Sequence, residues 1–166
     1  MSASIQITVT VPEIIISSAV VRLKIQNKLE RKTGPDMMKL FKKTTQGWEH
    51  NINFYQKSKN TNNEVSVTVF TRFKQYVLVN FGSPPHTITA KRPSGLLRFQ
   101  RGYKSSTRPG IISSRQKQRF GPIYETYFVE HPGFEAREFD KAIAEEIAET
   151  FAEDVQDAIS LGSSIF

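Results

Sequence analysis

The chain has 166 residues, enough for one domain of ordinary size, but its hydrophobic fraction of 38% is below the roughly 45–50% of a compact globular domain. It contains no cysteine, which excludes disulfide bonds and thiolate metal sites. No run approaches the ~18–20 apolar residues of a membrane span and no signal-peptide pattern opens the chain, so we expect a soluble protein made in a reducing compartment.

Charge is distributed unevenly along the chain. The net charge is +7, yet residues 91–119 hold nine basic side chains and no acidic one, whereas residues 135–157 hold nine acidic and two basic ones. A basic middle and an acidic C-terminal segment favour head-to-tail self-association, or an asymmetric partner, over uniform coating of nucleic acid.

The first third of the chain predicts a strand followed by two helices. Residues 4–11 alternate apolar and polar side chains as a strand does. Residues 13–31 carry apolar side chains at helical spacing, and Gly34-Pro35 is expected to end that helix. Its predicted stripe consists of Ile15, Ile16, Ala19, Val20, Leu23 and Leu29. A shorter helix, capped by Asp36 and closed by Gly47, would carry Met37, Leu40 and Phe41 on one side.

Residues 48–71 predict a β-hairpin. Trp48, Ile52 and Phe54 would share one face of its first strand, and residues 65–71 alternate as its second strand. Asparagine and threonine at residues 60–63 supply the turn between them.

Shorter elements separated by proline and glycine follow the hairpin. An apolar segment at residues 76–81, also interpreted as β-structure, would end at the Gly-Ser-Pro-Pro turn of residues 82–85, which is too rigid for a central strand. Residues 87–90 and 96–100 predict another pair of strands, and residues 124–129 predict the last one. Residues 101–121 show no periodicity, and a loop of about 20 residues is long enough to be functional.

The clearest predicted element is a long C-terminal helix that begins after the His-Pro-Gly turn of residues 131–133. Its apolar side chains recur every four residues, so the stripe winds around the helix. The stripe consists of Phe139, Ile143, Ile147, Phe151, Val155 and Ile159. We expect the acidic residues on the other sides to face solvent: Glu145, Glu146, Glu149, Glu153 and Asp154.

Together these elements predict an α+β fold, in which an N-terminal helix pair and a long C-terminal helix pack on a small, mostly antiparallel sheet. We expect a single domain over residues 1–166. Residues 1–12 would form an N-terminal strand or arm, residues 101–121 an extended basic loop and residues 160–166 a tail. The strand and the loop suit segments that become ordered on assembly, the strand by β-addition to a neighbour.

Candidates for catalysis are few. The chain has three histidines, His50, His86 and His131, and the last two each lie at a proline-containing turn, so they could approach one another in the fold. We expect the ring nitrogens of these two histidines to cap turn carbonyls and not to bind a metal, because the sequence does not offer the further ligands that a metal site needs. A small hydrolase using both histidines and a carboxylate is the weakest alternative. We expect no catalytic residue, no metal and no cofactor.

The basic segment is the one stretch whose composition indicates a partner. Its cations are interleaved with Phe99, Tyr103 and Phe120, as in segments that bind phosphates and stack on bases. A solvated loop explains each arginine taken singly, and Phe99 could instead belong to the core. A sequence-independent nucleic-acid-binding module therefore stays open as an alternative function. The candidate contacts with a partner or with DNA are Arg98, Arg101, Lys104, Arg108, Arg115, Lys117 and Arg119.

An ordered set of motifs runs through the chain between residues 34 and 159. It comprises a Gly-Trp pair, the turn of residues 82–85 followed by a histidine, a lysine, a Leu-Arg-Phe strand and the turn of residues 131–133. This set resembles the head–tail joining proteins of tailed bacteriophages, which are also described as tail-completion or minor tail components. The sequence departs from that pattern at Asn80-Phe81, at Ser83-Pro84 and in the long basic loop. The motif residues are Trp48, Phe54, Gly82, Pro85, His86, Lys91, Leu97, Phe99, His131, Pro132, Gly133, Arg137 and Phe139.

The resemblance implies a non-enzymatic virion protein that forms a closed homo-oligomeric ring, six- or twelve-fold, at the head–tail junction. Its implied partners are further copies of itself, a connector or portal-side protein, and a tail terminator or tail-tube protein, with DNA passing through the lumen. It also implies synthesis in the bacterial cytoplasm and no contact with a membrane. Rigid proline turns and polarised charge agree with a repeated ring subunit.

Overall fold

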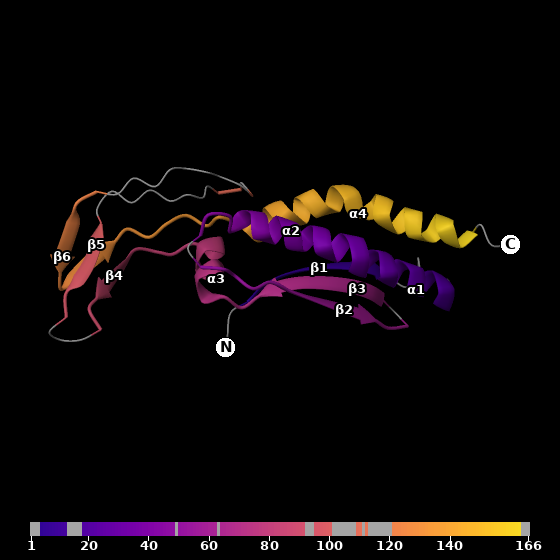
Figure 1. The fold of residues 1–166 in the computed structure, drawn as a ribbon, viewed down its shortest axis with the longest axis horizontal. Helices are drawn as coiled ribbons and strands as arrows, with labels where there is room; N and C mark the ends of the chain where they lie inside the picture. The colour runs from indigo at the N-terminus through magenta and orange to yellow at the C-terminus, as the bar shows by residue number, and fades with distance from the viewer. Residues whose placement is uncertain are drawn as a thin grey trace.

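The computed structural model describes residues 4–12, 18–48, 50–62, 64–91, 95–100, 109–110, 112 and 121–163. Its elements in chain order are β1 (Ile5–Pro12), α1 (Ala19–Lys28), the π-helical turn η2 (Leu29–Thr33), α2 (Gly34–Thr44), β2 (Tyr55–Asn60), β3 (Glu64–Thr71), α3 (Lys74–Phe81), β4 (His86–Thr89), β5 (Leu97–Gln100), β6 (Ile123–Thr126), β7 (Phe128–His131) and α4 (Phe139–Ser163). The helices and strands β1–β3 form a body, and strands β4–β7 form an arm that extends from one end of it (Figure 1). The arm denotes residues 86–91, 95–100 and 121–131.

The body is built on a three-stranded antiparallel sheet in the order β1-β3-β2. Strands β2 and β3 form the predicted hairpin, but β2 begins at Tyr55. The prediction that Trp48, Ile52 and Phe54 share a face of this strand is wrong, because all three precede it. Strand β1 pairs with β3 along its whole length, starting from Ile5 opposite Thr71. The predicted N-terminal strand is therefore confirmed, but it is not a separate arm, because its apolar side chains fill the chain's own core. Addition of a neighbour's strand to its outer edge stays a prediction.

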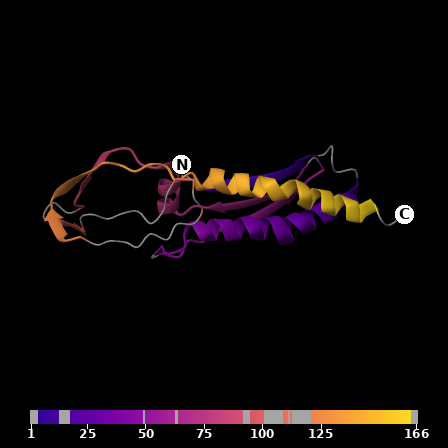
Figure 2. The same ribbon diagram turned by 90° about the horizontal axis from the view of Figure 1, so that it is seen from above.

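Helices α1, α2 and α4 cover one face of this sheet and lie side by side (Figure 2). The predicted α+β class, with a helix pair and a long C-terminal helix, is confirmed. Alternate residues of β1 and β3 point toward the helices and are buried there, as in an antiparallel sheet with one solvated face. The core consists of Ile5, Ile7, Val11, Ile25, Leu29, Met37, Leu40, Phe41, Ile52, Phe54, Val65, Val67, Val69, Tyr76, Val77, Phe139, Ile143, Ile147, Val155 and Ala158.

The N-terminal helix differs from its prediction at two points. It packs through Ile25 and Leu29, whereas Val20 and Leu23, predicted on the packed stripe, are 62% and 56% exposed. The helix also does not end at Gly34-Pro35. The π-helical turn continues it into α2, whose first turn contains Pro35, which has no N–H to donate to the preceding turn. The side chain of Gln56 donates to the carbonyl of Glu30 in that turn at 3.1 Å. The two isoleucines at residues 15 and 16 lie outside the described residues.

The predictions for the two short helices of the body, α2 and α3, differ in their success. The three apolar residues predicted on one side of α2 are all buried, and Gly47 follows its end with a φ of 91°. Residues 76–81, predicted as β-structure, belong instead to α3. Tyr76, Val77 and Asn80 are its buried residues, and spacings of one and four residues place them on one side of a helix.

Helix α4 confirms the predicted stripe: three of its six residues are essentially inaccessible, and the helix contacts β1, α2 and α1. The expected tail at residues 160–166 is wrong in part, because the helix continues to Ser163 and only the last three residues lie outside the described part. The four glutamates are exposed as predicted. Asp154 was wrongly predicted to face solvent; it is 2% exposed because α4 packs against α1 and η2, and Lys32 of η2 pairs with the buried carboxylate.

The arm consists of two two-stranded ribbons, in which β4 pairs with β7 and β5 pairs with β6. The strands predicted at residues 87–90 and 96–100 therefore exist, but they do not pair with each other. The strand predicted at residues 124–129 is divided at Tyr127 into β6 and β7. Of the predicted basic loop, the structure describes Pro109, Gly110, Ile112 and Gly121.

Candidate functional site

The arm is joined to the body by two segments that lie against each other, residues 82–85 and 132–135, which we call the junction. Ser83 and Phe134 exchange both backbone hydrogen bonds, each with a nitrogen–oxygen distance of 3.0 Å. The pairing continues into the arm, where His86 of β4 lies opposite His131 of β7. Two proline-containing turns that are distant in the sequence therefore meet at the base of the arm.

Two glycines permit this close approach. Gly82 and Gly133 have φ values of +77° and +79°, a region that glycine adopts without a steric penalty. A Cβ atom on Gly133 would lie 2.3 Å from the carbonyl oxygen of Ser83, and one on Gly82 would lie 2.7 Å from the backbone nitrogen of Ala136. Both neighbours are backbone atoms, so a larger residue at either glycine requires the junction to move.

The rings of His86 and His131 stack beside the junction, with centroids 5.1 Å apart and planes inclined by 27°. The predicted approach of these histidines is confirmed. Nδ1 of His86 lies 2.9 Å from the carbonyl oxygen of Pro84, which can only accept, so we assign the proton to this nitrogen. The Gly133 N–H donates to Nδ1 of His131 at 3.0 Å. His86 thus caps a turn carbonyl as predicted, whereas His131 accepts from a turn N–H.

The surroundings of the histidine pair do not form a nucleophile with its base. The Ser83 hydroxyl lies 3.2 Å from Nδ1 of His86, but that nitrogen donates to Pro84, and the same carbonyl also accepts from the hydroxyl at 3.1 Å. Across the described ranges, no group of three or more histidine, aspartate and glutamate side chains is arranged to hold a metal ion. The geometry is that of a hydrogen-bonded turn.

A buried amide beside the junction fastens α3 to α4. Asn80, at the end of α3, is 1% exposed; its Oδ1 accepts from the Asp140 N–H at 3.1 Å, and its Nδ2 donates to Oδ1 of Asp140 at 3.0 Å. This side chain satisfies an N–H of the first turn of α4 that has no helical partner. The backbone N–H groups of Arg137 and Glu138 donate to the carbonyl of Asn80 at 3.1 Å. In the sequence, Asn80 stands out only as a departure from the family pattern, although a polar residue inside an apolar segment is a signal for such a role.

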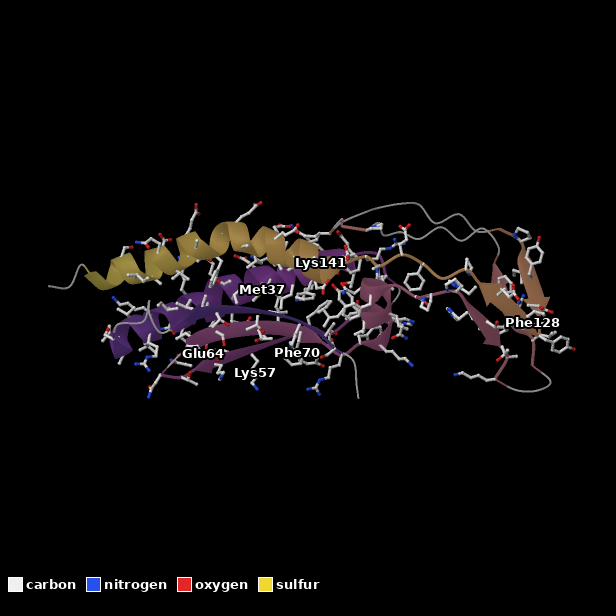
Figure 3. All side chains as sticks on the ribbon, turned by 180° about the vertical axis from the view of Figure 1, so that it is seen from behind. Met37, Lys57, Glu64, Phe70, Phe128 and Lys141 are labelled. Atoms are coloured by element: carbon white, nitrogen blue, oxygen red, sulfur yellow. The ribbon has the colours of Figure 1, made fainter. Side chains whose placement is uncertain are left out.

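The described part of the arm contains no buried residue. Five of its large apolar side chains are exposed: Leu96 by 50%, Ile123 by 52%, Tyr124 by 40%, Tyr127 by 64% and Phe128 by 58%. Figure 3 shows Phe128 near the end of the arm that is far from the body. An isolated two-stranded ribbon is at best marginally stable in water, and clustered apolar surface on a soluble chain marks an interaction site. The arm therefore has the character of an interaction surface.

The motif residues of the family resemblance fall into three groups. Those in the core surround the ring of Tyr76, whose centroid lies 6.0 Å from Trp48, 5.3 Å from Phe54 and 5.6 Å from Phe139. Burial raises the pKa of Tyr76, a central residue to which sequence analysis gave no role. The second group lies at the junction, at the base of the arm or directly after the junction: Gly82, Pro85, His86, His131, Pro132, Gly133 and Arg137. The third lies in the arm or at its edge: Lys91, Leu97 and Phe99.

Among the predicted cationic contacts, Arg98 is the one that the described residues include. Its Nε lies 3.8 Å from Oε1 of Glu125 on the paired strand, and both side chains are exposed. The basic loop touches the body at a described point, where the Gly110 N–H donates to the carbonyl of Arg137 at 3.0 Å and Ile112 packs against the core. The other predicted contacts lie outside the described residues: Arg101, Lys104, Arg108, Arg115, Lys117 and Arg119.

A charged cluster that sequence analysis missed ties α4 to the N-terminal helices. The buried carboxylate of Asp154 contacts the ammonium of Lys32 and accepts from the Thr33 hydroxyl at 3.3 Å. The ammonium of Lys28 lies 3.3 Å from Asp157 on the next turn of α4. The hydrogen bond with Asp154 raises the pKa of Lys32. This cluster has a structural role, because a carboxylate removed from water must be paired.

No protein-family model matches the chain, and neither curated proteins nor solved structures yield a match. Across the residues with a described position, no helix is both long and apolar enough to cross a membrane. The exposed arm, its tight junction and the polarised charge are the features from which a function can be proposed.

Proposed function

We propose that this chain is a structural subunit of the head–tail junction of a tailed bacteriophage, where identical copies form a closed six- or twelve-fold ring. The observation that carries the proposal is the arm, whose large apolar side chains are exposed although the body has a packed core. A subunit whose surface is completed by its neighbours is expected to look this way when it is considered alone. The ordered sequence motifs, which resemble those of head–tail joining proteins, indicate which kind of assembly we propose.

The charge distribution supports assembly in one direction. Residues 86–131 carry nine basic and two acidic side chains, a net charge of +7, whereas α4 carries seven acidic and one basic, a net charge of −6. The arm and the C-terminal end of α4 lie at opposite ends of the elongated molecule (Figure 1). A basic segment and an acidic helix in the same chain can attract one another between successive copies, and a head-to-tail contact generates a ring when its rotation closes.

In the proposed ring, one face binds a connector or portal-side protein and the other binds a tail terminator or tail-tube protein. Arg98 and the cations of the basic loop would lie at an interface or beside the DNA in the lumen. The proposed role requires no catalytic residue, metal or cofactor, and it places the protein in the virion after synthesis in the bacterial cytoplasm.

Native mass spectrometry over a range of salt concentrations, with negative-stain images of the same samples, tests this proposal. We expect a discrete six- or twelve-fold species that appears as rings, alone or after addition of the connector protein. A chain that stays monomeric under all these conditions and binds duplex DNA tightly at moderate salt would contradict the proposal.

A monomer that binds duplex DNA tightly would support a second candidate function, a sequence-independent nucleic-acid-binding module. The observation that favours it is the run of nine basic residues between 91 and 119 without one acidic residue. Such a module would bind free DNA with a steep dependence on salt, and charge reversal of Arg108, Arg115 and Lys117 would abolish binding. Absence of binding in a low-salt titration would exclude it.

A further inference from the structure

We infer that the uncovered face of the β1-β3-β2 sheet binds single-stranded nucleic acid, an inference that goes beyond the proposed ring and does not rest on it. Helices α1, α2 and α4 cover the other face, and Figure 3 shows Lys57 on the side of the sheet that points away from them. We call this side the outer face. Its described side chains come from alternate positions of the three strands and from the residue that follows β3: Gln6, Thr8, Thr10, Tyr55, Lys57, Lys59, Glu64, Ser66, Thr68, Phe70 and Arg72.

An aromatic platform lies at one end of the outer face. Tyr55 of the edge strand β2 is paired with Phe70 of the central strand β3, and their ring centroids lie 5.6 Å apart. Tyr55 is 51% exposed, and the guanidinium carbon of Arg72 lies 5.7 Å from the centroid of the Phe70 ring. An unpaired base stacks on the face of such an exposed ring, and an arginine beside the ring adds a cation–π contact or pairs with a phosphate.

The charges near this platform are positive. Lys57, two positions along β2 from Tyr55, is exposed, and no ion pair joins it to another described residue. Arg72 is exposed as well. Glu64 is the one acidic side chain among the described residues of the outer face, and it pairs with Lys59. Because Glu64 lies six positions along β3 from Phe70, or about 20 Å, it does not oppose a phosphate bound beside the platform.

The remainder of the outer face is polar and is built from short side chains. Thr8, Thr68 and Lys57 form a row across the three strands, and the two threonine hydroxyls hydrogen-bond at 2.8 Å. Gln6 and Thr10 are exposed. Short side chains allow an extended strand of nucleic acid to lie directly on the sheet, and hydroxyl and amide groups can hydrogen-bond to its phosphates and sugars.

Exposed rings distinguish the outer face from the other cationic surfaces of the body. Helices α1 and α2 also carry lysines, but the large apolar side chains that they expose are Val20 and Leu23, which have no π face. Phe81 of α3 is exposed, but Lys74, the cation of that helix, lies at its opposite end. A duplex keeps the faces of its bases within the stack, so a platform of this kind selects a single strand.

Fluorescence anisotropy of a labelled oligothymidylate of about 12 nucleotides, titrated with the full chain, tests the inference. We expect Tyr55→Ala to weaken binding at least about 5-fold, the lower limit for loss of one stacked base, and Tyr55→Phe, which keeps the ring, to bind like the natural chain. Lys57→Gln/Arg72→Gln should reduce the slope of log K against log salt by about 1.4, because two phosphates are no longer neutralised. Lys42→Gln/Lys43→Gln, which removes two exposed lysines of α2, is the charge-matched control and should leave the slope unchanged.

The variant Arg108→Glu/Arg115→Glu/Lys117→Glu separates the outer face from the basic loop. If this variant loses the oligonucleotide while Tyr55→Ala retains full affinity, the loop is the nucleic-acid site and the inference is overturned. Equal affinity for the oligothymidylate and for duplex DNA, with no effect of Tyr55→Ala, would indicate contact with phosphates alone and would also overturn it.

Two further measurements keep the result interpretable. Circular dichroism checks that each variant is folded, and if Tyr55→Ala is not, Lys57→Glu/Arg72→Glu, which changes exposed side chains, must abolish binding or the inference fails. Native mass spectrometry of the same samples scores the ring separately. Rings without oligonucleotide binding at low salt would overturn the outer-face site and leave the ring, whereas binding by a chain that forms no ring would support the site and count against the ring.

Discussion

Substitution of Gly133 by alanine tests whether the junction fixes the arm. The new Cβ atom would lie 2.3 Å from the carbonyl oxygen of Ser83 and 2.8 Å from the carbonyl carbon of Pro84. Adopting a φ of +79° costs an alanine about 1–2 kcal/mol. Relief of the clash by backbone movement costs a further ~1–3 kcal/mol. If the two Ser83–Phe134 hydrogen bonds break as well, each contributes about 1 kcal/mol.

Gly47→Ala is the matched control for this experiment. Gly47 also has a positive φ, +91°, but no heavy atom lies within 4 Å of the position that a Cβ would take. It therefore carries the conformational cost without the clash. Urea unfolding followed by fluorescence of Trp48, the single tryptophan, measures the free energy of unfolding of both variants. We expect Gly133→Ala to be less stable than Gly47→Ala by about 2 kcal/mol.

Hydrogen exchange distinguishes global destabilisation from local release of the arm. If the body holds while the junction opens, the unfolding midpoints of the two variants will agree, but the amides of Ser83 and Phe134 will lose protection only in Gly133→Ala. Equal midpoints together with unchanged protection of both amides would refute the reasoning, because the contact predicted by the geometry would then have no energetic consequence.

Two further predictions concern the body. The Thr44 hydroxyl donates to the carbonyl of Phe41 at 2.7 Å, so the Tyr76 hydroxyl donates to Thr44 at 2.9 Å. In urea unfolding, Thr44→Val should lower the free energy of unfolding by about 1–3 kcal/mol and Tyr76→Phe by about 1 kcal/mol. The double variant should lose less than the sum of the two, and strict additivity would contradict this pairing. Hydrogen bonds from Ser58, which contributes most, and from Gln26 lower the pKa of Glu30 below its ordinary value of 4.5. The ionised Glu30 therefore stabilises the folded state above pH 4.5, and this contribution is lost as the pH falls through the lowered pKa. Ser58→Ala should therefore destabilise the protein at neutral pH and lose its effect in acid, and a destabilisation independent of pH would contradict the assignment.

Patterns confined to a few neighbouring residues were predicted correctly. The second strand of the β2–β3 hairpin follows from the alternation of residues 65–71 after a polar turn, and the α4 stripe follows from its four-residue spacing. Each of these signals depends on local geometry that other parts of the chain do not alter. The approach of His86 to His131 was predicted only as a possibility, from the proline-containing turns at which both lie, because it is a contact between distant residues.

Several features of the candidate site depended on contacts between distant residues. The pairing of β4 with β7, rather than with β5, joins strands separated by the whole basic segment, and no local pattern specifies such a partner. The exposure of Tyr127 and Phe128 could not be predicted either, because an apolar side chain in a short strand is as consistent with a core as with an interface.

The sequence by itself determined the α+β class, the hairpin, the C-terminal helix and the polarity of charge along the chain, because these follow from periodicity and composition. Tertiary structure alone decided that residues 76–81 form a helix, since a six-residue apolar segment fits either period until its neighbours bury one side. It likewise decided that Val20 and Leu23 face outward while Ile25 faces the core, and that Asp154 is buried against Lys32. A helix with apolar residues on two sides, or a carboxylate near a lysine, acquires its environment only when the packing partner is in place.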